Sequence, residues 1–296
     1  MSREYFVNKD SIVREIWGKG DTILFIFAGA SSEFSLNKAV DWLYFTGKLP
    51  ADPLGRLFST VSYARKIVFS EKEAANRAID SIAAIHLAVE EKGGTKIPDW
   101  AYRDVLFMLI DYSIRAFEIM ERELSRAEKQ EVFYVFTRVG ARMGIPDLPT
   151  TFEAWVGMRQ GHLKQDLEYS HYTKDLYKQY RKHLGPVRYR LLLEAQTLVV
   201  PDKAKKMLSF RKVSLLIPVL GAYKQSRKVK LDRIIKALIL PSEYKKDIDD
   251  LDAVPEKATS CPYRVKPSGV EVKKCKKEGL LKKRKSLKSP QDLHNE

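Results

Sequence analysis

The sequence predicts an all-α protein with one multi-helix domain and a basic tail. Apolar residues recur every three or four positions through most of the chain, which is the spacing of one helical face. Alternation with a period of two, the pattern of half-buried strands, is scarce. Residues that typically start and stop helices divide the chain into roughly nine or more helices with short connections and no internal repeat.

Three segments are predicted before the first proline. Asp10 or Ser11 can cap a short helix that runs through Trp17, because a side-chain oxygen can accept hydrogen bonds from the first backbone amides. An apolar run follows over 22–28. Serines directly before Glu33 then predict a helix over 33–45, which a glycine closes.

The next two helices carry strong start signals. Asp52 as N-cap and Pro53 in the first turn predict a helix to about Phe69, because proline lacks the amide hydrogen that this position leaves unpaired. Ser70 with Glu73 is the capping-box pattern for the following helix, which a glycine pair ends. The apolar stripe of that helix contains Ala75, Ile79, Ile82, His86 and Val89.

The second half of the chain continues with helices. Pro98 and Asp99 open a long helix to about Leu124, and a threonine caps a segment around Trp155. The remaining predicted helices cover 126–142, 161–183, 186–197, 201–208, 211–222 and 228–239.

Composition limits the class of protein. Hydrophobic residues make up 44% of the chain, enough for a sizeable core. No apolar run reaches the ~18 residues of a membrane span, and the charged first residues do not resemble a signal peptide. The chain has two cysteines, Cys261 and Cys275, which argues against a disulfide scaffold or a cysteine zinc site. Together, these observations predict a cytoplasmic protein without a transmembrane segment.

The net charge of +15 is unevenly distributed. Residues 253–296 hold 12 Lys or Arg against 5 Asp or Glu, and Pro, Lys, Ser and Gly dominate there. We therefore expect a helical domain over 1–252 and a basic, disordered tail over 253–296. Such a tail can bind nucleic acid or anionic lipid weakly, although a merely solubilising tail is the simpler interpretation.

Three polar side chains are unusual for a packed helical core. His86 lies on an apolar stripe, where a neutral imidazole can serve as an axial ligand of haem iron. A core histidine bonded to a carbonyl is the commoner alternative. Arg56 and Thr60 lie four apart on one partly apolar face, where the arginine needs an anion such as a haem propionate or an internal carboxylate. Thr60 can donate to the same anion or to its own helix.

These positions form an ordered pattern: Asp52-Pro53, Arg56-Leu57, Thr60 and Ile85-His86. The pattern resembles the rubber oxygenase family, which includes latex-clearing proteins and the MpaB oxygenase. Trp17 before an apolar run, Tyr102 before a long apolar helix, and the turn 144-GIPDLPTTF-152 agree with it. The resemblance covers roughly residues 12–165.

The resemblance implies an all-helical fold, related in outline to globins, with haem b in a pocket between helices. It implies that His86 is the proximal iron ligand and that Arg56 and Thr60 support the haem site. The implied partners are dioxygen and a hydrophobic, isoprenoid- or lipid-like small molecule. In rubber oxygenases the reaction is oxidative cleavage of a carbon–carbon double bond.

Two features depart from the family pattern. Many members have a His-Pro pair where this chain reads 28-AGASSEF-34, and rubber oxygenases have a lysine at the position of Ser59. The proximal half of the site therefore matches better than the distal half. Glu33 in the altered stretch is a conjectural distal acid or base, with a surface helix cap as the alternative. Three histidines outside this pattern suit no common metal motif, and we expect them on solvated helix faces, with a non-haem metal site as the weaker alternative: His162, His171 and His183.

Three functions remain open from the sequence. The first is a haem-dependent oxygenase, and the second is a haem-binding sensor or carrier without oxygenase activity. The third is a helical binding module whose basic tail contacts nucleic acid or membrane. A glycine-rich phosphate loop, a Ser-His-Asp arrangement and a CxxC motif are all lacking.

Overall fold

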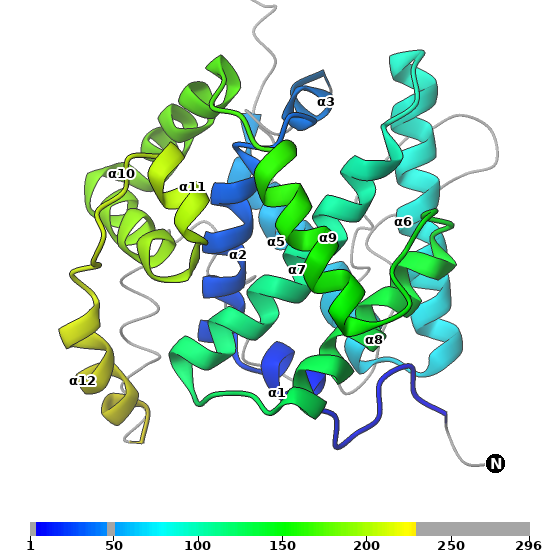
Figure 1. The fold of residues 1–296 in the computed structure, drawn as a ribbon, viewed down its shortest axis with the longest axis horizontal. Coiled ribbons are helices and arrows are strands. Elements are labelled where there is room, and N and C mark those ends of the chain that lie inside the picture. Colours follow the sequence, from blue (N-terminus) through cyan, green and yellow to red (C-terminus); the bar gives the residue numbers. More distant parts are fainter. Residues whose placement is uncertain (1–3, 46–50, 229–296) are drawn as a thin grey trace, which may run out of the picture. The chain divides into compact units, whose positions relative to one another are not determined.

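The computed structural model describes residues 4–45 and 51–228 of the chain. All regular elements in these residues are helices, and β-structure is limited to two isolated bridges, so the all-α prediction is confirmed (Figure 1). The helices are α1 (Ile12–Gly18), α2 (Gly20–Phe34), α3 (Val40–Phe45), α5 (Pro53–Phe69), α6 (Lys72–Gly93), α7 (Asp99–Met120), α8 (Arg126–Arg142), α9 (Phe152–Gln165), α10 (His171–Val199), α11 (Asp202–Met207) and α12 (Ile217–Lys228).

The chain divides into two units, Met1–Ala258 and Thr259–Glu296, and every described residue belongs to the first. The proposed tail over 253–296 and the predicted helix over 228–239, apart from its first residue, lie outside the described residues. No described helix is both long enough and apolar enough to cross a bilayer.

Helices α2 and α7 pack against each other at the centre of this unit. Helix α10 packs against α2, and α8 packs against α7 (Figure 1). Trp17, at the end of α1, is fully buried against this centre and donates from Nε1 to Ser113 Oγ of α7 at 3.2 Å. Gly29 lies where α2 meets the ring of Tyr112 in α7, and a Cβ atom there would overlap that ring. The close contact of α2 and α7 therefore depends on glycine at this position.

Local signals set several helix ends as predicted. Asp52 caps α5 by accepting a hydrogen bond from Gly55 N at 2.8 Å. Thr151 caps α9 in the same way, and α8 matches the predicted range of 126–142. Gly94 ends α6 in the left-handed conformation, with φ of 67°. These ends depend on residues near in sequence, which is why the sequence alone could place them.

The predicted helix over 33–45 is wrong. Helix α2 continues from the apolar run to Phe34, and only Val40–Phe45 forms the short helix α3. Ser31, one of the two serines expected to cap a new helix, bonds back within α2 instead, because its Oγ donates to Ala28 O at 3.0 Å. Glu33 therefore lies in the last turn of a helix and not at the start of one.

Other boundaries also differ from the predictions. The predicted helix over 161–183 is two helices, since α9 ends at Gln165 and Ser170 caps α10 with Thr173. The predicted break between the helices over 161–183 and 186–197 is confirmed, because α10 has a kink at Gly185. Helix α6 starts at Lys72 without a side-chain cap, so the capping box predicted at Ser70 is not formed. The predicted helix over 211–222 is replaced by α12, in which the proline lies in the first turn, where the missing amide hydrogen costs nothing.

We expect Gly29→Ala to lower the free energy of unfolding by about 1–3 kcal/mol, because the added methyl group overlaps a fully buried tyrosine ring. Urea denaturation followed by circular dichroism measures this change. Gly157→Ala in α9 is the matched control, because no atom lies within 4 Å of its Cβ position. It should be neutral or stabilise the protein by up to about 1 kcal/mol. Equal changes in the two variants would contradict the close contact.

Candidate active site

A cavity of about 860 Å³ lies among α2, α5, α6, α7, α8, α10 and α12. Its volume falls within the ~300–1,000 Å³ typical of cofactor and small-molecule sites. Most lining side chains are apolar, for example Leu24, Phe25, Ile82, Val105, Leu109 and Leu192. Water gains little in such a space, whereas a hydrocarbon or a flat apolar cofactor loses no hydrogen bond by entering it.

His86 and Thr60 both line this cavity. His86 lies on α6 and Thr60 on the adjacent helix α5. The His86 ring packs edge-on against Tyr102, with 5.3 Å between ring centroids and 89° between planes. Arg56 lies in α5, but its side chain is outside the described part of the structure. The structure therefore brings two of the three predicted haem-site residues to one cavity.

The tyrosine that contacts His86 is itself held in place. Tyr102 donates from its hydroxyl to Glu90 Oε1 at 3.0 Å. Burial and this acceptor raise the pKa of Tyr102, so the phenol keeps its proton near neutral pH. The imidazole of His86 thus packs against a neutral ring whose position is set by a hydrogen bond.

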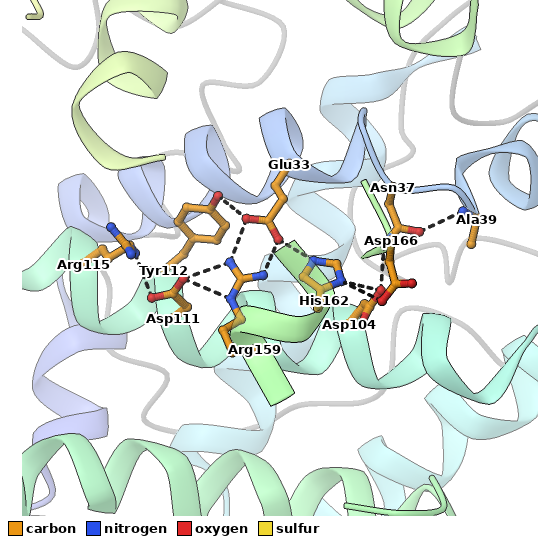
Figure 2. Close-up of polar contacts among 10 residues, drawn as sticks. All are labelled: Glu33, Asn37, Ala39, Asp104, Asp111, Tyr112, Arg115, Arg159, His162 and Asp166. Atoms are coloured by element: carbon orange, nitrogen blue, oxygen red, sulfur yellow. Dashed lines mark hydrogen bonds and ion pairs between the residues drawn. The ribbon is translucent and has the colours of Figure 1, made fainter. Parts of the chain in front are cut away.

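Glu33 does not line the cavity. It is fully buried, with 0% of its surface exposed, and it faces α7 and α9 (Figure 2). Tyr112 donates to Glu33 Oε2 at 2.7 Å, and Arg159 donates to both carboxylate oxygens, including Oε2 at 2.7 Å. His162 Nε2 lies 2.8 Å from Oε1. The carboxylate thus contacts three side chains, and the surface cap that we considered for Glu33 is wrong.

The same cluster continues on both sides of Glu33, as Figure 2 shows. On one side, Arg159 donates to Asp111 Oδ2 from Nε at 3.1 Å and from Nη2 at 2.8 Å. On the other side, His162 Nδ1 lies 2.5 Å from Asp104 Oδ2, which also accepts from Asn37 Nδ2 at 3.1 Å. We call Glu33, Asp104, Asp111, Tyr112, Arg159 and His162 the buried ion-pair network.

Charges in this network compensate one another. Burial alone would raise the pKa of Glu33, but the charge and hydrogen bonds of Arg159 and the contact with His162 hold it well below its usual range. Burial lowers the pKa of His162, yet Asp104 and Glu33 outweigh burial and raise it above the ordinary value. For Arg159 the carboxylates likewise outweigh burial and raise the pKa. Glu33 is therefore ionised, and His162 is protonated over a wider pH range than a free histidine.

Asp104, His162 and Asp166 also place one potential metal-ligand atom each within 4.8 Å of one another. Two ligands of one metal, each about 2 Å from the ion, are usually about 3 Å apart. The 2.5 Å between His162 Nδ1 and Asp104 Oδ2 is instead the distance of a short charge-assisted contact. We therefore interpret this group as part of the ion-pair network and not as a metal centre.

The prediction that His162 lies on a solvated helix face is wrong, because only 3% of its surface is exposed. Its partners come from segments distant in the sequence, which the sequence does not reveal. A usable signal was the spacing of Trp155, Arg159 and His162 by four and three positions, which places them on one face of α9. All three are buried.

Residues 21–219 match the family model described as "ER-bound oxygenase mpaB/B'/Rubber oxygenase, catalytic domain". The chain belongs to this oxygenase family. No curated protein and no solved structure matches the chain. The resemblance drawn from the sequence is thus confirmed, and the matched residues extend well beyond position 165.

In this member of the oxygenase family, the matched residues contain the ion-pair network and nearly the whole cavity lining. The two regions lie on different sides of α2. Ala30, Ser31 and Phe34 line the cavity, whereas Glu33 contacts α7 and α9. The network thus supports one wall of the cavity without exposing its charges there.

We expect Arg159→Met to lower the free energy of unfolding by about 3–5 kcal/mol, because it leaves two buried carboxylates without their main cation. Arg115→Met is the matched control, since Arg115 pairs with the same Asp111 but is 40% exposed. It should cost less than about 1 kcal/mol. Urea denaturation of both variants measures the difference. Similar losses would argue against a network held mainly by Arg159.

The network also predicts a pH dependence. Because the folded pKa of His162 is raised, its charged form stabilises the fold fully below the unfolded pKa of ~6.5, and this contribution is lost as pH rises through the folded pKa. The destabilisation caused by His162→Gln should therefore be largest near pH 5.5 and smaller at pH 9. Glu33 stays ionised across this window because its pKa is lowered.

Urea denaturation at several pH values tests this dependence. His171→Gln serves as the control, because His171 is exposed at the start of α10. A cost of His162→Gln that does not change with pH would contradict a protonated imidazole in the network.

Proposed function

We propose that the protein is a haem-dependent oxygenase that acts on a hydrophobic, isoprenoid- or lipid-like substrate. The observation that carries the proposal is the placement of His86 and Thr60 on one mostly apolar cavity, within the part of the chain that matches an oxygenase catalytic domain.

The residues present fit haem b. The cavity offers one imidazole for the iron, apolar side chains for the macrocycle, and a cation for a propionate. That cation is Arg188, whose Nε is buried without a hydrogen-bond partner among the described residues. His86 would bind the iron, and Thr60 would support the site from α5. The family resemblance implies that Arg56 would also support the haem site.

Bound haem would supply the iron that activates dioxygen. The protein would contribute three things. The apolar walls exclude water and bind the hydrocarbon part of the substrate. The imidazole of His86 keeps its position through the edge-on contact with Tyr102. The buried charges of the network lie outside the lining, so the cavity remains apolar.

Oxidative cleavage is the reaction that this site suits. Both atoms of dioxygen are added as the carbon–carbon double bond breaks, so two carbonyl groups form and no external reductant is consumed. A substrate with isolated double bonds and few polar groups matches the apolar lining. The substrate class is therefore an unsaturated hydrocarbon chain.

A specific departure favours a second candidate, a haem-binding protein without oxygenase activity. Ser59 lines the cavity at the position where rubber oxygenases have a lysine. A serine hydroxyl carries no charge at neutral pH, so it cannot replace a lysine in electrostatic interactions. A carrier or sensor would need the histidine that binds the iron, but it would not need a charged side chain at the position of Ser59.

We expect the purified protein to show a Soret band, or to gain one on haem addition, and His86→Ala to lose it. His171→Ala, at an exposed histidine, should retain it. Absorption spectra measure both results. Aerobic incubation with squalene should then give carbonyl products that are missing under nitrogen.

A protein that takes up no haem would overturn the proposal. A Soret band without any oxygen-dependent product from squalene or from an unsaturated fatty acid would instead favour the carrier or sensor.

A further inference from the structure

One cation lies on the cavity-facing side of α10. The lining residues of this helix are spaced by three, four or one position, so they form a single stripe. All of them except the arginine are aliphatic or aromatic: Tyr180, Leu184, Arg188, Leu191, Leu192 and Ala195. A charged side chain in such a stripe requires an explanation, because burying a charge without a partner costs free energy.

The backbone places Arg188 just after the kink in α10. Gly185 has φ of 71° and ψ of 173°, a conformation that residues with a Cβ atom rarely adopt. Pro186 follows it, where its fixed φ suits the start of the second helical segment. Arg188 therefore lies in the first turn of that segment, on the same side as the apolar residues before and after the kink.

Two carboxylates, one on the same helix as Arg188 and one in the cavity lining, accept other hydrogen bonds. Its Nε is buried and has no hydrogen-bond partner among the described residues. Glu194, on the same helix, accepts hydrogen bonds from Arg211, Ser214 and the amide of Leu215. Asp21 is the single carboxylate among the described lining residues, and it accepts from Thr22 N at 2.8 Å and from the hydroxyl of Tyr223 at 3.5 Å.

Arg159 shows what an arginine with a structural role looks like in this protein. Its guanidinium donates to two carboxylates, one of which is fully buried. Arg188 has no such carboxylate among the described residues. The difference indicates that the partner of Arg188 is a group that enters the cavity.

The charge of the lining indicates which anion fits. Arg188 is the single lysine or arginine among the described lining residues. One guanidinium balances one negative charge, and its planar donors match the two oxygens of a carboxylate. A diphosphate carries more charge and would need further cations, which the described part of the lining does not offer.

We propose that Arg188 binds the carboxylate of a molecule held in the cavity, while the rest of that molecule contacts the apolar walls. The carboxylate can be a propionate of haem or the head group of an unsaturated acid used as substrate. This inference rests on the proposed function only in taking the cavity as the active site.

The experiment compares Arg188→Gln with Arg190→Gln, which removes an exposed arginine from the same helix. Haem is titrated into each purified protein, and the Soret band gives the dissociation constant. Equilibrium dialysis with radiolabelled oleate and oleyl alcohol gives the affinity for two chains that differ in the head group. The second measurement does not require that haem binds.

If the cofactor supplies the carboxylate, Arg188→Gln should weaken haem binding by about 10- to 100-fold, the usual effect of losing a charge-assisted hydrogen bond. If the substrate supplies it, haem binding should stay unchanged and oleate should bind about 10- to 100-fold more weakly. In both cases oleyl alcohol and the Arg190→Gln variant should behave as the unmodified protein does.

Unchanged haem and oleate binding in Arg188→Gln would overturn the proposal, as would equal losses in Arg190→Gln or a wild-type protein that binds neither ligand. A protein that binds oleate through Arg188 but takes up no haem would refute the proposed function and leave this inference standing.

Arg188→Gln should unfold at no lower temperature than the wild type, because Arg188 Nε has no hydrogen-bond partner to lose among the described residues. If it does not fold, Arg188→Lys keeps the charge but loses the planar pair of donors. That variant should lose part of the affinity for the carboxylate, and full retention in both assays would overturn the proposal.

Discussion

The ion pair between Glu33 and Arg159 is the constraint on which the arrangement of the central helices depends. A carboxylate with no exposed surface is tolerable only where donors surround it, and here they come from α7 and α9. Because the donors lie on different helices, the carboxylate is satisfied only when α2, α7 and α9 take these relative positions. Gly29, in the same helix as Glu33, allows α2 to approach the tyrosine that completes the set.

This constraint separates charge from the cavity. Helix α2 directs Glu33 toward the network, while Ala30 and Phe34 line the cavity. The three carboxylates of the network are paired with Arg159 and His162 within the core and with Arg115 beside it, and none of these three cations lines the cavity. The cavity can thus remain apolar although a strongly charged cluster lies one helix away. An imidazole and a guanidinium in such surroundings interact strongly with whatever enters, because little solvent screens them.

The sequence predicted the parts of this architecture that depend on nearby residues. The start of α5 follows from Asp52 and Pro53, and the placement of His86 on a cavity-facing stripe follows from helical spacing. The break between α9 and α10 was missed, because no glycine or proline marks it and its local signal is the capping Ser170. It is set by backbone hydrogen bonds to a distant loop, such as Glu168 N to Leu36 O at 2.6 Å. The partners of Glu33 were equally inaccessible, since Arg159 is 126 residues away.

Two arginines show where sequence reasoning stops. Arg159 and Arg188 each lie among apolar neighbours at helical spacing, so the sequence alone does not distinguish them. The structure separates them by their acceptors, because Arg159 donates to carboxylates of its own chain, whereas Arg188 Nε has no hydrogen-bond partner among the described residues. A cation that the fold already neutralises stabilises the fold, whereas a cation facing a cavity without an acceptor leaves binding free energy available to a ligand. The acceptor, and not the position in the stripe, therefore distinguishes a structural arginine from a binding one.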